Sequence, residues 1–269
     1  MLAGLATGAM SGAIGIGGAS LSTPAVRLLG ASAYLAVGTT LPSIFPGAAV
    51  GTVRFVRGGL VDARAVLWSV PPGLLGAVAG SLASHALPGH GRALMIATAV
   101  LLAVSAVRIA RSSPPEAAPG GLAAVPAGDG PDGGGPRASN GGGPPRPWVL
   151  GAIGLGAGLL SGLLGVGGGT VLVPGLVELG RYPIKTAVAT SLVCVGLLAI
   201  PSTVAHAALG DIDWRFAAFL TLGVMPGARM GAAGAVRAGE GRFRLAVAGF
   251  LGMLALFFGA GEIIALLRR

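Results

Sequence analysis

The segment GLLSGLLGVGGGTVLVP runs from Gly158 to Pro174 in a chain of 269 residues. A second copy, GAMSGAIGIGGASLSTP, lies 150 residues earlier, from Gly8 to Pro24, and seven of the seventeen aligned positions are identical. Each copy is apolar, and its middle is nearly all glycine. Glycine inside a helix is less favourable than alanine by roughly 1 kcal/mol. We therefore predict that each copy is a helix broken at its centre.

The composition around these copies is that of a membrane protein. Hydrophobic residues make up 53% of the chain, charged residues only 10%, and the mean hydropathy is +0.83. Soluble domains need far more charge, about a quarter of their residues. The 50 glycines suit helices that approach each other closely through small residues in lipid. We expect an all-α polytopic protein of the cell inner membrane.

The net charge of +9 does not indicate nucleic-acid binding, because the arginines lie at the ends of apolar segments and form no basic stripe with aromatic residues. Cys194 is the single cysteine, which excludes an intrachain disulfide and a CxxC pair, so we expect it to pack in the interior. Met1 is followed directly by apolar sequence, so we expect no removable signal peptide. No cofactor or metal ion is expected.

Eight apolar segments divide into two sets of four. A membrane-spanning helix needs roughly 17 to 25 residues, and most of the segments reach this length. Residues 111–147 between the sets are rich in Gly, Pro and Ala and are predicted to be a disordered cytoplasmic connector. The predicted organisation is a first transmembrane repeat over 1–110, this connector, and a second repeat over 148–269. The segments are Leu2–Val26, Leu28–Val53, Ala65–Gly91, Ala93–Val107, Trp148–Val177, Thr186–Gly210, Phe216–Val236 and Leu245–Gly261.

The duplication continues beyond the glycine motif, with the offset grown to 151. Three further landmarks recur in the same order, so we interpret the halves as an internal repeat. Asp62 and Asp213 precede matched segments, and we expect both to be helix N-caps. The matches are Ala36-Val37-Gly38-Thr39-Thr40-Leu41 with Ala187-Val188-Ala189-Thr190-Ser191-Leu192, Val61-Asp62-Ala63-Arg64 with Ile212-Asp213-Trp214-Arg215, and Gly76 and Gly80 with Gly227 and Gly231.

The distribution of basic residues indicates how the two halves are oriented. Lys and Arg collect in cytoplasmic loops. Four crossings per half would place 10 basic residues on one side and 7 on the other. If the glycine-broken element instead enters and leaves on the same side, the division is 12 against 5, which favours three crossings and an inverted repeat. Making the Thr-Thr-Leu-Pro element re-entrant gives 11 against 6, so this alternative stays open.

Broken helices at membrane depth predict a binding site for an anion. A break exposes backbone N–H groups that carry about half a positive charge. Two such ends that meet near the midplane of an inverted repeat form the usual site of a secondary transporter. The alternative is that these small and hydroxylated residues serve close helix packing or bond back to their own turn. The candidate residues are Gly15, Gly17, Gly18, Thr39, Thr40, Gly165, Gly167, Gly168, Gly169, Thr190 and Ser191.

Two ionisable residues are further candidates. Arg229 is the only charged residue well inside an apolar segment, and its aligned partner is Val78. Such residues are costly in lipid, which favours a role in substrate binding or gating over a snorkelling or capping arginine. His206 aligns with Phe55 and is a candidate for proton coupling, since imidazole exchanges protons near neutral pH. The alternative is an interfacial histidine.

The repeated motifs resemble those of the sulfite exporter TauE/SafE family of membrane permeases. The resemblance rests on Gly15-Ile16-Gly17-Gly18 up to Pro24, on Gly165 to Gly169 up to Pro174, and on the A-V-x-T-[ST]-L that follows each. It covers roughly 230 residues. It implies an inner-membrane carrier for small sulfur-containing anions, such as sulfite, sulfoacetate or other organosulfonates, coupled to protons.

Other functions are weaker interpretations of the same sequence. A passive anion channel could use the same broken helices, because their positive ends serve channels equally well. An enzyme is not expected, since no HExxH, GxSxG or intramembrane cluster of His, Asp and Glu is present. The expected partners are a small anionic substrate and the lipid bilayer.

Overall fold

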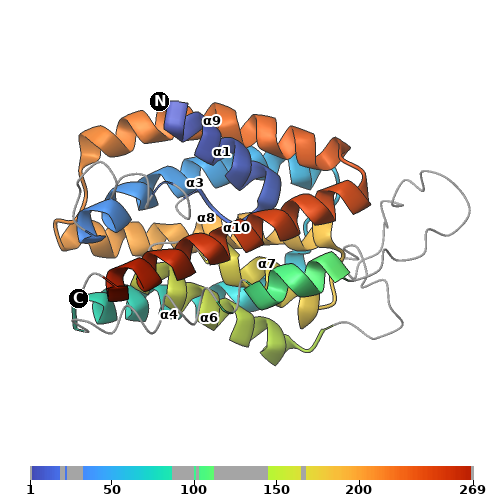
Figure 1. The fold of residues 1–269 in the computed structure, drawn as a ribbon, viewed down its shortest axis with the longest axis horizontal. Coiled ribbons are helices and arrows are strands. Elements are labelled where there is room, and N and C mark those ends of the chain that lie inside the picture. Colours follow the sequence, from blue (N-terminus) through green and yellow to red (C-terminus); the bar gives the residue numbers. More distant parts are fainter. Residues whose placement is uncertain are drawn as a thin grey trace, which may run out of the picture.

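The chain forms a helical bundle in which the long helices run along the longest axis of the molecule (Figure 1). The computed structural model describes residues 2–18, 22, 33–86, 100, 103–111, 145–164 and 168–267. Within these ranges there is no strand, so the predicted all-helical class is confirmed. Residues 103–111 are also helical. The helices are α1 (Leu2–Ile14), α3 (Ala33–Arg57), α4 (Ala63–Ala86), α6 (Pro147–Leu164), α7 (Gly169–Glu178), α8 (Ile184–Ala208), α9 (Trp214–Arg237) and α10 (Glu240–Leu267).

Several helices have the length and composition of membrane spans. In the described part of the chain, three helices are long and apolar enough to cross a bilayer, and they lie within α4, α8 and α9. Helices α6 and α7 are shorter apolar helices, because the glycine-rich sequence between them interrupts a single apolar segment. Most of the predicted connector, residues 112–144, lies outside the described residues.

Each helix start that follows the matched Asp is capped as the sequence predicts. The Asp213 carboxylate accepts hydrogen bonds from the backbone N–H groups of Arg215 and Phe216 at the start of α9, at 3.0 and 3.1 Å. The Asp62 carboxylate accepts one from Ala65 at the start of α4, at 2.8 Å. Both satisfy N–H groups that a helix leaves without an internal acceptor.

The first helix of each half packs against a long helix of the other half. Helix α1 lies along α9, and α6 lies along α4. Both contacts are made by glycines spaced four residues apart, which allow two backbones to touch. Gly4, Gly8 and Gly12 of α1 abut Leu220, Val224 and Ala228, while Gly154, Gly158 and Gly162 of α6 abut Ser69, Gly73 and Ala77. The two contacts are related by the repeat, with an offset of 150 between the glycines and 151 between their partners.

Helices α3 and α8, which are equivalent in the two halves, meet in the middle and run antiparallel. A methyl group at Gly51 of α3 would lie 2.8 Å from the Leu192 side chain, and one at Gly196 of α8 would lie 2.8 Å from Ala48. Sequence number therefore rises along one helix as it falls along the other. The cross-half pairs are again reciprocal, because α3 contacts α9 and α8 contacts α4.

One end of the bundle carries most of the basic residues. We call it the connector end, because helix 103–111 stops there and α6 begins there (Figure 1). Lys185 Nζ donates to the Ala238 carbonyl at 2.7 Å, and Arg108 pairs with Glu178 at 3.3 Å, so the start of α8 and the ends of α7 and α9 share this end. The basic residues at the connector end are Arg54, Arg57, Arg64, Arg108, Arg111, Arg146, Arg181, Lys185, Arg237, Arg242 and Arg244.

Candidate functional site

The helix break predicted in each glycine motif is observed. Helix α1 ends at Ile14, and the next residues include Gly15 and Gly17 with φ of 73° and 84°. These values lie in the left-handed region, which glycine adopts without strain. In the second copy, α6 ends at Leu164 and α7 begins at Gly169. The candidates Gly165 and Gly167 lie outside the described residues.

The two breaks touch each other in the interior of the bundle. A methyl group at Gly169 would lie 2.5 Å from the backbone of Ile16, so α7 begins directly against the first break. A methyl group at Gly15 would overlap the Val188 carbonyl of α8. Gly15, Ile16 and Gly169 are all buried. Only glycine permits this approach, so the repeated motif brings segments 150 residues apart into contact.

A hydroxyl group of the second half donates a hydrogen bond to the backbone at the first break. Ser191 Oγ donates a 2.9 Å hydrogen bond to the Gly15 carbonyl, and both residues are buried. Thr40, the counterpart of Ser191, is also fully buried, and its carbonyl accepts a hydrogen bond from Ser43 at 2.7 Å. Ser191 and Gly15 are thus brought together as the candidate site requires.

The other two candidate hydroxyls join the halves reciprocally. Thr190 Oγ1 accepts a hydrogen bond from the backbone N–H of Asp62, and Thr39 Oγ1 accepts one from the backbone N–H of Asp213, each at 3.0 Å. In both cases a threonine of one half holds the start of a helix of the other half. These contacts were missed from the sequence, although both residue pairs are related by the same offset of 151.

The start of α7 has the properties of an anion-binding helix end. Its N-cap is Gly168, which supplies no side-chain hydrogen bond to the first turn. Gly168, Gly169 and Thr170 are buried, and the break leaves these amides inside the protein rather than in water. Backbone N–H groups at a helix start carry partial positive charge and favour an anion. Gly18, the counterpart of Gly168, is also buried.

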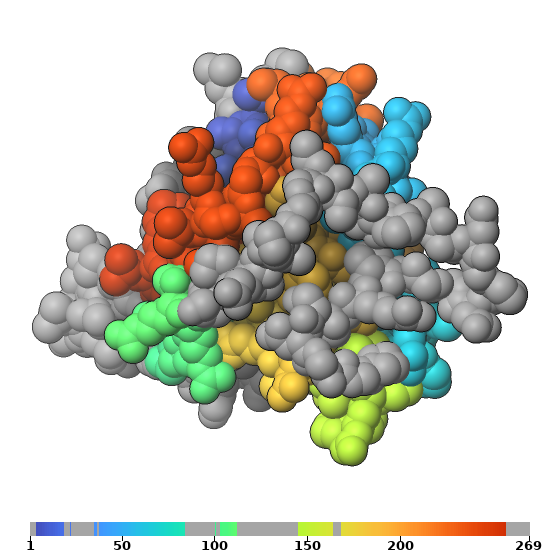
Figure 2. Space-filling view, turned by 90° about the vertical axis from the view of Figure 1, so that its right-hand side faces the viewer, coloured from blue at the N-terminus to red at the C-terminus, as the bar shows by residue number. Residues whose placement is uncertain are grey.

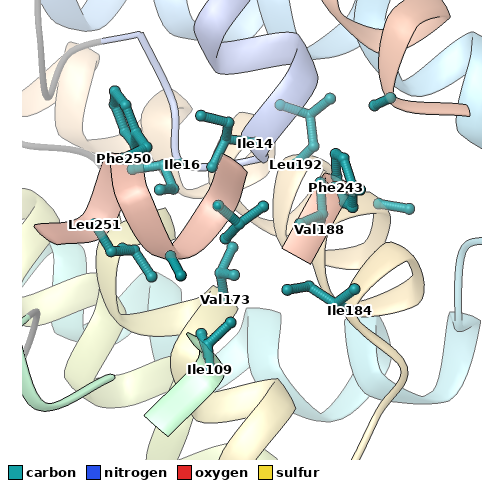
Figure 3. Packing of buried hydrophobic residues seen from close by; sticks show 14 of the residues in the cluster. Ile14, Ile16, Ile109, Val173, Ile184, Val188, Leu192, Phe243, Phe250 and Leu251 are labelled. Carbon is teal, nitrogen blue, oxygen red and sulfur yellow. The ribbon is translucent and has the colours of Figure 1, made fainter. Parts of the chain in front are cut away.

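Apolar side chains enclose the breaks in this structure. Ile16 is 1% exposed and belongs to the largest buried cluster, together with residues of α7, α8 and α10. Figure 3 shows Phe250 and Leu251 of α10 beside Ile16, and Val173 of α7 close to them. The arrangement is closed around the glycine backbone, so an anion could reach it only after these side chains move.

His206 lies in the interior beside an acidic residue. Its side chain is 1% exposed, and Nδ1 lies 3.2 Å from an oxygen of Asp211, while the Asp211 backbone N–H donates to the His206 carbonyl at 3.0 Å. The first half has the same backbone bond, from Leu60 to Phe55, but no ionisable side chain there. The imidazole is therefore enclosed by protein, and its role in proton coupling stays a prediction. The Asp211 partner was missed, although its alignment with Leu60 was a usable signal.

Arg229 is not brought together with the glycine breaks. It is exposed on α9 on a face that includes Met225 and Met230, whereas the adjacent Ala228 packs against Gly12. Arg229 makes no ion pair within the part of the chain that the structure describes. The aligned Val78 of α4 is likewise exposed, so the equivalent faces of α4 and α9 both point outward.

Two further polar contacts hold the connector end together and were not anticipated. Lys185, at the start of α8, donates to the Val236 and Ala238 carbonyls at 3.4 and 2.7 Å and so caps the end of α9. Tyr182, in the turn before α8, hydrogen-bonds to Asp62. Burial, followed by the charge and hydrogen bond of Asp62, raises the pKa of Tyr182 well above its usual value.

The fold and the site together define a membrane transport protein: a multi-pass helical bundle in which the buried break after α1 contacts the start of α7. The described residues contain no group of three or more His, Cys, Asp or Glu side chains that could hold a metal ion. The family model described as sulfite exporter TauE/SafE matches residues 1–258. The chain therefore belongs to the TauE/SafE family of membrane transporters.

Two curated relatives carry matching descriptions. One is the probable membrane transporter protein YunE of Bacillus subtilis (strain 168), 39% identical over 82 residues, and the other is a probable membrane transporter protein of Xylella fastidiosa (strain 9a5c), 32% identical over 80 residues. Each match covers 30% of this chain, and it spans only 30% and 31% of the length of the two relatives. No solved structure matches the chain.

Proposed function

We propose that this protein is a secondary transporter that moves small sulfur-containing anions, such as sulfite, sulfoacetate or other organosulfonates, across the inner membrane. The family supplies the substrate class. The observation that carries the proposal is the contact between the two breaks, in which Gly169 of one half abuts Ile16 of the other and Ser191 bonds to Gly15. A secondary transporter places its site at such a junction between repeats.

In this proposal the anion binds where the helix interruptions meet. Backbone amides at the start of α7 and the hydroxyl groups of Thr40 and Ser191 would replace part of its hydration shell. Arg229 would act on the anion as it approaches and not at the centre of the site. The same region would be shaped by Gly17, Gly18, Thr39, Gly165, Gly167, Gly168 and Thr190. The buried Ile16 supports a state closed to both sides, because water cannot reach the break past it.

The orientation that we propose is an inverted repeat with the connector end in the cytoplasm. The antiparallel course of α3 and α8 supports inversion, since equivalent helices of two inverted halves run in opposite directions. The basic residues at the connector end support its cytoplasmic location through the positive-inside rule.

Flux measurements on purified protein in liposomes test the proposal. We expect saturable uptake of labelled sulfite or sulfoacetate and exchange against unlabelled anion inside. Gly169→Ala should abolish both, because its methyl group would lie against Ile16, whereas Gly156→Ala has nothing within 4 Å and should leave both unchanged. Absence of saturable flux for every sulfur anion would contradict the carrier, and single-channel currents would favour the passive anion channel instead.

We propose that His206 carries the coupling proton. The charged imidazolium would pair with the Asp211 carboxylate, and loss of the proton would remove this charge pairing next to Gly38, which lies close to the Asp211 backbone carbonyl. Asp213, two residues further along the same turn, is held by Thr39 of α3. A change of charge at His206 would therefore alter the contacts among α8, α9 and α3.

A double variant that gives the second half the residues of the first removes this pair, and we expect it to fold. We expect the double variant His206→Phe, Asp211→Leu to exchange anions but to lose the stimulation of uptake by an imposed pH gradient. Ser202→Ala on the same helix is the control, because that hydroxyl bonds only within its own helix, to Leu198 at 3.2 Å. A double variant that still responds fully to the gradient would place the coupling proton elsewhere.

A further inference from the structure

A groove of about 460 Å³ lies at the connector end between helix 103–111, α6 and α7. Figure 2, which views the molecule from this end, shows residues 103–111 in green beside the yellow surface of α7, with the start of α6 below in yellow-green. Its walls are mainly apolar and include Val149, Ile153, Val171 and Leu179. The groove is separate from the glycine breaks and has no part in the proposed transport mechanism.

The volume of the groove fits one acyl chain. A small group such as a water molecule takes about 30 Å³ in the liquid. A methylene group is of similar size, so the groove has room for roughly 15 such groups. Trp148 lies at its rim and is 67% exposed. Tryptophan is enriched at the level of lipid headgroups, which places this rim at the membrane surface.

A polar pair lies at the edge of the groove. Arg108 Nη1 lies 3.3 Å from Glu178 Oε2, and Glu178 lines the groove. The second oxygen, Oε1, is buried and has no hydrogen-bond partner in the described part of the chain. A buried carboxylate oxygen without a donor is unfavourable. A ligand that carries a hydroxyl group would supply the missing donor.

Exposed arginines surround the same end. Arg146 precedes Trp148 by two residues, Arg181 follows Leu179 by two, and Arg108 and Arg111 lie at the end of helix 103–111. Glu178 is the one acidic residue among the lining residues. The excess of positive charge at a membrane surface selects an anionic headgroup.

We propose that the groove binds an anionic phospholipid whose headgroup also carries hydroxyl groups, as phosphatidylglycerol does. One acyl chain fills the apolar groove between α6 and α7. The phosphate lies among Arg108, Arg146 and Arg181, and a glycerol hydroxyl donates to Glu178 Oε1. The lipid thereby joins helix 103–111 of the first half to α6 and α7 of the second, at the end where the halves are also joined by Arg108 and Glu178.

Native mass spectrometry of the full chain, purified in detergent and mixed with defined lipids, tests this site. We expect retained phosphatidylglycerol, less phosphatidic acid, which has the phosphate without the glycerol hydroxyl, and least phosphatidylcholine. Removing each arginine should weaken phosphatidylglycerol binding about fivefold. Arg146→Gln and Arg181→Gln are the charge variants, and Arg215→Gln, at the opposite end of the bundle, is their control.

A steric variant tests the groove independently of charge. Ala152 lines the groove and is exposed, so Ala152→Phe fills it without disturbing the core, and Ala218→Phe on the exposed face of α9 is its control. Ala152→Phe should lose the retained lipid, and Ala218→Phe should keep it. Equal retention of phosphatidylcholine and phosphatidylglycerol by the wild type, or full retention by Ala152→Phe, would overturn the proposal. Neither result would bear on anion transport, which is measured separately.

Discussion

Alanine substitution at four glycines separates the two physical reasons for glycine in this fold. Gly15 combines a φ of 73° with close approach to a main-chain carbonyl. Gly59 has a φ of 63° but nothing within 4 Å of an added methyl group. Gly169 is helical, but a methyl group there would lie 2.5 Å from Ile16. Gly156 has neither constraint, since it lies within α6 with open space around it.

These differences set the expected cost of each substitution. A left-handed conformation costs a residue with a side chain about 1–2 kcal/mol. An extra methyl group in a packed interior costs about 1–3 kcal/mol. Gly15→Ala should therefore destabilise by about 2–5 kcal/mol, Gly169→Ala by about 1–3 and Gly59→Ala by about 1–2. Gly156→Ala should stabilise by up to about 1 kcal/mol, because alanine favours the helix.

Thermal unfolding in detergent, followed by tryptophan fluorescence, measures the series. For a chain of this size, 1 kcal/mol shifts Tm by about 2–4 °C. Gly15→Ala should lower Tm by about 4–20 °C and should have the largest effect, while Gly156→Ala should not lower it. If Gly15→Ala and Gly59→Ala unfold at the same temperature, the close approach at the first break is wrong. If Gly169→Ala matches Gly156→Ala, the two breaks do not meet.

Three other predictions concern polar contacts between helices. Thr39→Val and Thr190→Val should each cost about 1–3 kcal/mol, because a backbone N–H loses its acceptor, and unequal Tm shifts would contradict the reciprocal junction. The stabilisation from the raised pKa of Tyr182 should be complete below about pH 10 and be lost in more alkaline solution, and Tyr182→Phe should remove this loss of Tm. Lys185→Met should cost about 1.5 kcal/mol, and an unchanged Tm would show that its bonds to α9 are weak.

The features predictable from the sequence are those with a local cause. Glycine at Gly15 and Gly169 ends or begins a helix through its own backbone, so the breaks follow from residue type and position. The N-caps at Asp62 and Asp213 are equally local, because each carboxylate bonds to residues two or three positions along the chain. The apolar segments also predicted α8 and α9 to within about two residues at each end.

Features that depend on pairing between distant helices were not predictable in the same way. The sequence offered two alternatives for Thr39 and Thr190, a binding site or a bond within their own turn. In the structure their hydroxyls bond to residues 174 and 128 positions away, an arrangement that depends on how α3 meets α9 and α8 meets α4. The sequence showed that Arg229 lies well inside an apolar segment. The direction of its side chain depends instead on which face of α9 packs against α1.

Residues that differ between the two halves have other roles than residues that recur in both. Positions that recur in both halves, such as the glycines of α1 and α6 and the Thr–Asp junctions, make contacts that hold the bundle together. Three ionisable residues of the second half have an apolar counterpart in the first: His206 replaces Phe55, Asp211 replaces Leu60, and Arg229 replaces Val78. An inverted pair of identical halves would be symmetric across the membrane and could not distinguish one side from the other. We expect a difference between the two sides to come from unmatched residues such as these, so variants that restore the matched residue should affect coupling before they affect folding.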